Sequence, residues 1–87
     1  MPKEIMSEYT IEEMLKKLMI DRCGIPEEKF RPDATLQGDL ELDSLDAVEL
    51  AMGLEDEFTI EVVDQDLVNV RTVRDLITLI VRKRDAA

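Results

Sequence analysis

The sequence predicts an all-α fold: a small up-down bundle of three main helices plus one short helix, with a long loop between helices one and two. Three segments carry apolar residues at the three- and four-residue spacing of an amphipathic helix. Between the first two segments, residues 25–42 keep no helical or strand period, and Pro26, Pro32 and Gly38 interrupt them. A chain of 87 residues suffices for one domain with one modest core.

The first helix is expected at residues 10–23. The run Thr10-Ile11-Glu12-Glu13 has the pattern of a capping box, with Thr10 as N-cap and Glu13 reaching back to it. One buried stripe then consists of Ile11, Met14, Leu15 and Leu18. Gly24 can take the left-handed conformation that ends a helix, so the helix is expected to end there.

Residues 25–42 form a loop longer than most connections in compact domains, and loops of this length are usually functional or disordered. Apolar residues are spaced through it: Ile25, Phe30, Leu36, Leu40 and Leu42. We expect these side chains to pin the loop to the helices.

The second helix is expected at residues 44–58, and its helical wheel has two apolar faces. The wider face, suited to the core, consists of Ala47, Leu50, Ala51, Leu54 and Phe58. The narrower stripe, well over 100° away, consists of Leu45, Val48 and Met52 and is bordered by Glu55 on one side and by Glu49 and Asp56 on the other. Either this stripe is an exposed recognition surface, or loop residues such as Leu36 and Leu42 cover it.

A β-branched connector at residues 59–63 precedes a short helix at 64–70 that Asp64 is expected to cap. Thr72 begins the last helix, whose buried stripe is Val73, Leu76, Ile77 and Ile80. Arg82, Lys83 and Arg84 complement the negative end of that helix dipole. The expected organisation is a tail at residues 1–9, a helical domain at 10–84 and a short tail at 85–87.

The charge is strongly negative, −10 overall, and the middle of the chain is acidic throughout. Residues 32–70 contain no Lys or Arg but twelve acids: Asp33, Asp39, Glu41, Asp43, Asp46, Glu49, Glu55, Asp56, Glu57, Glu61, Asp64 and Asp66. A solvated surface explains part of this pattern. The charge argues against nucleic acid and anionic membrane surfaces as partners and favours basic proteins.

Several classes of chemistry are excluded by composition. With one cysteine, Cys23, and no histidine, the chain cannot form a disulfide framework, a Cys/His zinc site or a histidine-dependent triad. No apolar run approaches membrane-spanning length, and the first residues lack the apolar block of a signal peptide. We therefore expect a cytoplasmic protein without a membrane span. We also expect a monomer, and no catalysis by the chain alone, because the carboxylates of Asp43 and Asp46 lack a second domain that would form a cleft.

Ser44 falls at the N-terminus of the second helix, where unpaired backbone N–H groups and the helix dipole favour an anion such as a phosphate. The alternative is that Ser44, or Asp43 before it, only caps the helix.

The second helix and the residues just before it contain the runs Leu42-Asp43-Ser44-Leu45-Asp46, Val48-Glu49-Leu50 and Leu54-Glu55-Asp56-Glu57-Phe58. Together these runs resemble the phosphopantetheine attachment site and second helix of acyl carrier proteins. The resemblance continues without a gap over residues 10–81, so it has the right flanks, length and charge as well as the Asp-Ser-Leu core.

The resemblance implies that Ser44, flanked by Asp43 and Leu45, carries a covalent 4'-phosphopantetheine arm attached by a phosphopantetheinyl transferase. Acyl groups would travel as thioesters on this arm to fatty acid, polyketide or related biosynthetic enzymes with basic docking patches. The residues implied for docking are Asp46, Val48, Glu49, Met52, Glu55, Asp56 and Glu57, with Asp43 and Leu45 beside the serine. Those implied for an inner acyl cavity are Leu50, Leu54, Val62, Leu67, Val70 and Leu76, which could equally be ordinary core.

Three positions depart from the family pattern: Glu41 stands where Gly is usual, Leu36 where an aromatic is common, and Val63 where Pro often precedes the short helix. Glu41 changes backbone freedom and charge close to Ser44. It therefore bears on recognition by a standard transferase and favours a specialised carrier.

Three other functions are alternatives to the carrier. An unmodified acidic interaction module would bind basic proteins through the same face and would not need Ser44. A calcium-binding loop starting at Asp39 fails, because Ser44 would stand where the turn Gly belongs and Leu50 where the bidentate Glu belongs. A peptidyl carrier shares the fold, but the heavy acidity is more typical of the acyl class.

Overall fold

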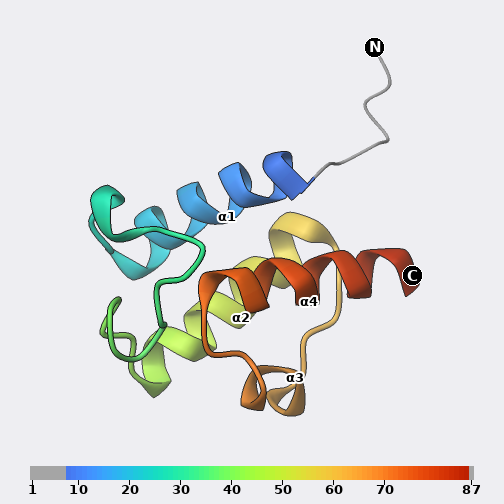
Figure 1. Ribbon diagram of the computed structural model, residues 1–87. Helices are drawn as coiled ribbons and strands as arrows, with labels where there is room; N and C mark the ends of the chain where they lie inside the picture. The colour runs from blue at the N-terminus through green and yellow to red at the C-terminus, as the bar shows by residue number, and fades with distance from the viewer. Residues whose placement is uncertain (1–7, 87) are drawn as a thin grey trace.

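The computed structural model describes residues 8–86 and confirms the all-α fold, because no strand occurs in that range. The elements in chain order are α1 (Glu8–Cys23), the 3-10 turn η1 (Glu27–Lys29), α2 (Ser44–Phe58), α3 (Asp64–Val68) and α4 (Val73–Ala86). Figure 1 shows the three long helices and the long loop that joins α1 to α2. The predicted architecture, three main helices and one short one, is therefore confirmed.

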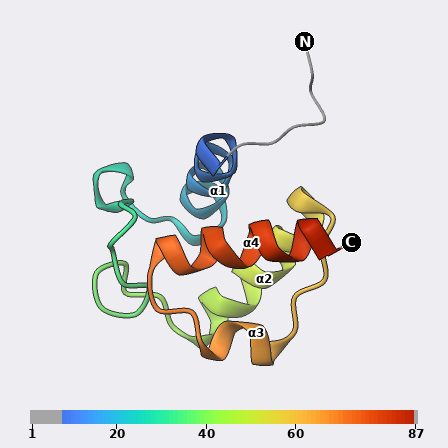
Figure 2. The same cartoon turned by 45° about the vertical axis from the view of Figure 1, so that its right-hand side comes forward.

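The three long helices contact one another pairwise, and α3 lies apart from α1 at the other side of the bundle. In both Figure 1 and Figure 2, α4 crosses α2, α1 lies above this pair and α3 below it. The salt bridge between Lys83 Nζ and Asp66 Oδ2, 2.8 Å long, ties α3 to α4.

The core lies between α1, α2 and α4 and is built from the predicted stripes. Buried members are Ile11, Leu15 and Leu18 in α1, Leu50, Leu54 and Phe58 in α2, and Val73, Leu76, Ile77 and Ile80 in α4, with Met14, Ala47 and Ala51 half-buried. Met19 of α1 is also fully buried, although the stripe predicted for that helix did not include it.

Helix ends differ from prediction at four places, one of which is the end of α3 at Val68, where the short helix was expected to run to residue 70. Helix α1 begins at Glu8, so Thr10 lies inside the helix and is not its N-cap. Helix α4 extends to Ala86, so residues 85–86 continue the helix and do not form a tail. The N-cap of α3 is Val63, not Asp64, and the Val63 N–H is satisfied by Asp66 Oδ2 at 3.0 Å. The rest of the two expected tails, residues 1–7 and 87, lies outside the described range.

The long loop is pinned to the bundle, as its apolar residues predicted: Ile25, Phe30, Leu40 and Leu42 are buried. It starts at Gly24, whose φ of +70° is the left-handed conformation expected at the end of α1. Further along, the loop pairs with the start of α4 through an isolated antiparallel bridge between Thr35 and Thr72. The backbone bonds that fasten it run from Leu36 N to Arg71 O (2.8 Å), Val73 N to Ala34 O (3.1 Å) and Arg74 N to Pro32 O (2.9 Å).

Gly53 sets the distance between α1 and α2. A Cβ at this position would lie 2.8 Å from Leu18 Cδ1 and 2.9 Å from Arg22 Cδ. The missing side chain therefore permits the close approach of the two helices, which accounts for a glycine inside α2 despite its cost of about 1 kcal/mol to helix stability.

Candidate functional site

The functional site is built on the first turn of α2, where Ser44 is the first helical residue and Asp43 is the N-cap. Asp43 has extended backbone geometry, with φ −104° and ψ −171°. Its carboxylate accepts a hydrogen bond from Asp46 N (3.0 Å), and the Asp46 carboxylate accepts one from Asp43 N (3.2 Å). This reciprocal capping box fixes the angle at which the chain enters α2 and with it the position of Ser44.

Capping is thus the role of Asp43, which leaves the Ser44 hydroxyl available for chemistry. Ser44 is exposed, and no group in the described part of the chain forms a hydrogen bond with its hydroxyl. The hydroxyl lies at the positive end of the α2 dipole, where a phosphodiester would be stabilised. Of the two roles considered for this position, anion attachment therefore fits Ser44 and capping fits Asp43.

Asp43 holds a negative charge beside Ser44. Hydrogen bonds to its carboxylate, chiefly from the Asp46 N–H, lower the pKa of Asp43 below its ordinary value. The carboxylate is consequently ionised at neutral pH, yet it is turned toward the helix amides.

Ser44 stands on the lining of a cavity of about 660 Å³. The cavity is formed by the long loop, α2, α3 and the α3–α4 connection, and its lining is Thr35, Leu36, Gln37, Gly38, Leu42, Asp43, Ser44, Ala47, Leu50, Leu67, Val68, Val70 and Arg71. Apolar side chains dominate it, and Asp43 and Arg71 are its charged residues. A cavity of this kind can take an aliphatic chain attached near its edge.

Half of the predicted cavity residues lie in this lining. Leu50, Leu67 and Val70 face the cavity, whereas Leu54, Val62 and Leu76 do not line it and are buried in the core instead. Periodicity identifies a buried face but does not distinguish core from cavity along the same face. The loop residues that sequence reasoning missed, Thr35, Gln37 and Gly38, have no periodic signal to reveal them.

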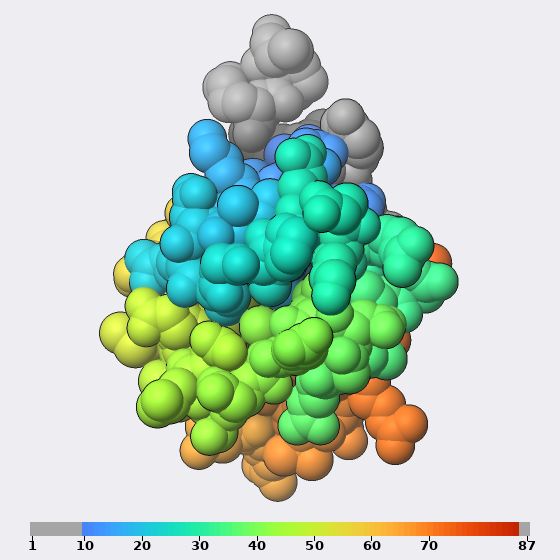
Figure 3. Space-filling model, turned by 90° about the vertical axis from the view of Figure 1, so that its left-hand side faces the viewer, coloured from blue at the N-terminus to red at the C-terminus, as the bar shows by residue number. Residues whose placement is uncertain are grey.

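The second apolar stripe of α2 is exposed, as one of the two interpretations predicted. The exposed fractions of Leu45, Val48 and Met52 are 79%, 58% and 51%. Leu42 is buried and Leu36 half-buried, and the stripe stays exposed beside them. In Figure 3 the surface of α2 lies open between α1 above and the α3–α4 segment below, beside the long loop.

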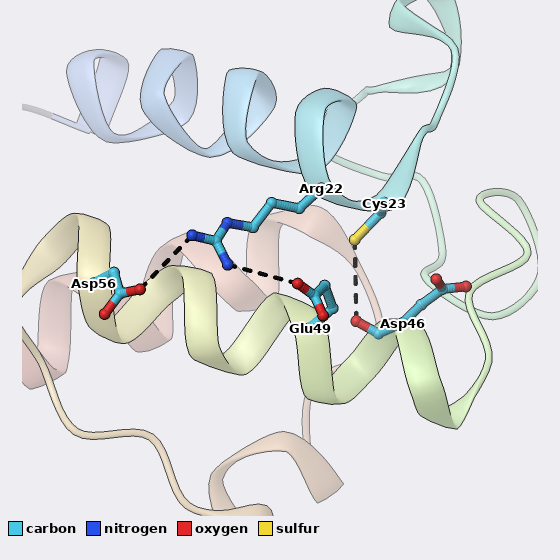
Figure 4. A network of polar contacts seen from close by, with 5 residues as sticks. All are labelled: Arg22, Cys23, Asp46, Glu49 and Asp56. Carbon is cyan, nitrogen blue, oxygen red and sulfur yellow. Dashed lines mark hydrogen bonds and ion pairs between the residues drawn. The ribbon is translucent and has the colours of Figure 1, made fainter.

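The acids expected to dock partners fall into distinct environments. Glu49 and Asp56 form ion pairs with Arg22 of α1 (Figure 4). Glu55 is half-buried and accepts a hydrogen bond from Val62 N at 2.9 Å, and the Asp46 carboxylate serves the capping box. Glu57 is exposed and has no ion pair within residues 8–86.

Glu41 adopts a conformation that favours glycine, with φ at +56°. Its side chain is exposed and lies 3.9 Å from Lys29 Nζ. The position three residues before Ser44 therefore has left-handed backbone geometry, in which a glycine would be unstrained.

Cys23 packs near the same helix end without forming a reactive site. The half-buried thiol donates a long contact of 4.0 Å to Asp46 O, and burial raises the pKa of Cys23. A raised pKa keeps the sulfur protonated and poorly nucleophilic. Between residues 8 and 86 no cluster of three His, Cys, Asp or Glu side chains could hold a metal ion, and no helix in that range is long and apolar enough to cross a membrane.

Comparison with known proteins agrees with this geometry. Residues 13–80 match the family described as phosphopantetheine attachment site. The fold is similar to the crystal structure of an acyl carrier protein from Thermotoga maritima, with a TM-score of 0.79 and 25% sequence identity, covering 91% of this chain and 92% of that one. An exposed serine at a helix N-terminus, on the lining of an apolar cavity, fits the covalent 4'-phosphopantetheine that this match implies. The chain belongs to the phosphopantetheine attachment family, as a carrier with the fold of acyl carrier proteins.

Proposed function

We propose that this protein holds acyl groups as thioesters on a 4'-phosphopantetheine arm at Ser44 and delivers them to fatty acid, polyketide or related biosynthetic enzymes. The observation that carries the proposal is the position of the exposed Ser44 side chain on the lining of a cavity of about 660 Å³ with mainly apolar walls. The cavity would shelter the acyl chain, while the exposed serine leaves the arm free to enter a partner enzyme.

Ser44 needs an external base, since this chain has no histidine and its neighbouring carboxylates are engaged in capping. On the transferase, Ser44 Oγ would attack the β-phosphorus of coenzyme A and lose its proton to a transferase base. The bond from that phosphorus to the bridging oxygen would break, and adenosine 3',5'-bisphosphate would leave.

Partner docking is proposed on the exposed face of α2, which we call the docking face: Leu45, Val48 and Met52 with the acids around them. Charge complementarity supports enzymes with Lys- and Arg-rich patches as partners, because the net charge is −10 and no base lies within residues 32–70. The apolar stripe would add short-range contact, and the exposed acids would raise the association rate. We further propose that the chain acts as a monomer.

The proposal is tested by the intact mass of the chain after incubation with coenzyme A, magnesium and a panel of phosphopantetheinyl transferases. Wild type should gain one phosphopantetheine, and Ser44→Ala should gain none. A folded wild type that no transferase modifies would contradict the proposal and favour an unmodified acidic interaction module, in which Ser44→Ala is silent. The acyl group that the protein carries is then identified by offering the modified protein acyl donors of different chain lengths and measuring which of them are loaded.

A further inference from the structure

An arginine of this chain occupies the acidic edge of the docking face. Arg22, in the last turn of α1, reaches across to α2 and ion-pairs with two carboxylates at once. One terminal nitrogen lies 3.7 Å from Glu49 Oε2, and the other lies 3.7 Å from Asp56 Oδ2. Figure 4 shows the guanidinium between these two carboxylates, which stand two turns apart on α2.

The sequence of α2 makes room for this arginine. Gly53 lies between the two carboxylates, and a Cβ there would stand 2.9 Å from Arg22 Cδ and 3.2 Å from Arg22 Nε. Any larger residue would push the arginine stem away from the helix. The glycine therefore serves both the packing of Leu18 and the course of the Arg22 side chain.

Among the described residues, Arg22 forms the ion pairs of the α2 carboxylates, and these pairs are weak enough for another cation to replace Arg22. No other ion pair within residues 8–86 involves a carboxylate of α2. The side chains of Arg22, Glu49 and Asp56 remain 35%, 50% and 74% exposed. Ion pairs with that exposure are screened by salt and contribute little to folding.

We propose that Arg22 is an intramolecular counter-ion, which the lysines or arginines of a docking enzyme must displace from Glu49 and Asp56. This inference rests on the proposed docking function of α2. Arg22 occupies the positions that a partner's cations would take, so it lowers the affinity of every basic partner and shortens the contact. A shuttle protein benefits from such a competitor, because release is as necessary as binding.

The first test measures transferase kinetics on the full chain with Arg22→Gln, Arg22→Lys and the control Arg74→Gln. Arg74 is exposed on α4 and has no ion pair among the described residues, so the control makes the same charge change away from α2. At low salt, KM for the Arg22→Gln chain should fall roughly threefold with kcat unchanged, as expected if two exposed ion pairs compete with docking. Arg22→Lys should fall between wild type and Arg22→Gln.

Salt and a double-mutant cycle separate competition from a simple change of net charge. The advantage of Arg22→Gln should vanish in high salt, where exposed pairs are screened. Replacing both acids, Glu49→Gln with Asp56→Asn, should raise KM more in the Arg22→Gln background than in wild type. Equal KM values for Arg22→Gln and Arg74→Gln, or a higher KM for Arg22→Gln, would overturn the inference.

A second measurement does not depend on modification of Ser44. Binding of octalysine to the unmodified chain should be tighter for Arg22→Gln than for Arg74→Gln at low salt. If no transferase modifies wild type but octalysine shows this difference, the proposed carrier function fails while the role of Arg22 stands. If wild type is modified and both probes treat the two variants alike, only the inference about Arg22 fails.

Discussion

Asp43 and Asp46 exchange hydrogen bonds across the first turn of α2, and Ser44 is held between them. The two N–H···O distances, 3.0 Å and 3.2 Å, close a capping box made entirely of aspartates. Two residues that could be mistaken for an acid–base pair beside a nucleophile therefore act as structural supports. Their effect on Ser44 is exerted through the backbone of α2.

Replacing the cap should loosen the helix and slow modification together. Asp43→Ala removes the acceptor of the Asp46 N–H, so the melting temperature should fall by roughly 5 °C. Thermal unfolding followed by circular dichroism checks this, with Asp33→Ala as a control at an exposed acid that forms no hydrogen bond within the described range. A loss of transferase rate with an unchanged melting temperature would instead assign Asp43 a direct role in recognition.

Placing glycine at position 41 should stabilise the fold. Glu41 has φ +56°, which costs a non-glycine residue about 1 kcal/mol, so Glu41→Gly should raise the free energy of unfolding by about that amount. Urea denaturation measures this change.

Thr59→Gly is the matched control for Glu41→Gly. Thr59 has φ +53° at the C-terminal cap of α2, so its replacement should give a similar gain of about 1 kcal/mol. Only Glu41→Gly should also change the rate at which a standard transferase modifies Ser44. Equal transferase rates for both variants would mean that Glu41 affects stability alone.

Filling the cavity with a larger side chain should abolish the stabilisation that a bound acyl chain provides. Loading an acyl chain onto modified wild type should raise its melting temperature by roughly 5 °C, because apolar surface is buried at about 25 cal/mol per Å². Val70→Phe places a ring in the cavity lining and should abolish that rise. Val81→Phe, also at a half-buried valine but outside the lining, should preserve it. Retention of the full rise by Val70→Phe would place the cargo elsewhere.

Three aspartates should govern acid unfolding. The pKa is lowered for Asp66 chiefly by the Lys83 ammonium, for Asp75 by the N–H groups of Arg71 and Thr72, and for Asp43 by the Asp46 N–H. Because the unfolded values lie near 3.9, unfolding takes up protons below that pH. This contribution to stability is therefore complete above about pH 5 and is lost as the pH falls through the lower, folded-state values.

Urea midpoints from pH 7 down to pH 2.5 check this expectation. In the Lys83→Met variant the urea midpoint should fall less between pH 4 and pH 2.5 than in wild type, because the pKa of Asp66 is then closer to its ordinary value. If the urea midpoints of Lys83→Met and wild type fall equally at acid pH, the Lys83–Asp66 pair does not contribute to the pH dependence of stability.

Enlarging Gly53 should separate α1 from α2. Gly53→Ala gains helix propensity, but its Cβ would meet Leu18 Cδ1 at 2.8 Å, and Leu18 is buried. Overpacking should outweigh the propensity gain and lower the free energy of unfolding by about 1 kcal/mol. Chemical denaturation measures this, and Ala51 in the same helix offers the comparison Ala51→Gly, which should be destabilising for the opposite reason. A more stable Gly53→Ala would show that Leu18 and Arg22 move aside freely.

The sequence predicted those features that depend on local periodicity. It placed α2 at residues 44–58 and separated the exposed stripe of Leu45, Val48 and Met52 from the core face, because both follow from the helical repeat. It could not separate Leu54 and Val62 from the cavity lining, because that distinction depends on where the loop and α3 come to rest.

Contacts between distant segments could not be predicted from the sequence, because they too depend on how the helices pack. The pairing of Arg22 with Glu49 and Asp56 joins residues on different helices, and no spacing rule connects them. The left-handed conformation of Glu41 was foreshadowed only by the departure from the usual glycine. The N-cap of α3 was misplaced by one residue, because Asp64 looks like a capping residue whereas Val63 occupies that position.

Two edges of the cavity are held by different kinds of contact. Between the loop and the start of α4, one edge is closed by backbone hydrogen bonds from Leu36 N to Arg71 O and from Val73 N to Ala34 O, next to the antiparallel bridge. On the other edge, α3 buries none of its residues fully and is tied to α4 by the Lys83–Asp66 ion pair. If an acyl chain needs more room than the cavity offers, we expect α3 to move before the loop does, because backbone hydrogen bonds hold the loop to α4, whereas α3 is tied to α4 by a side-chain ion pair.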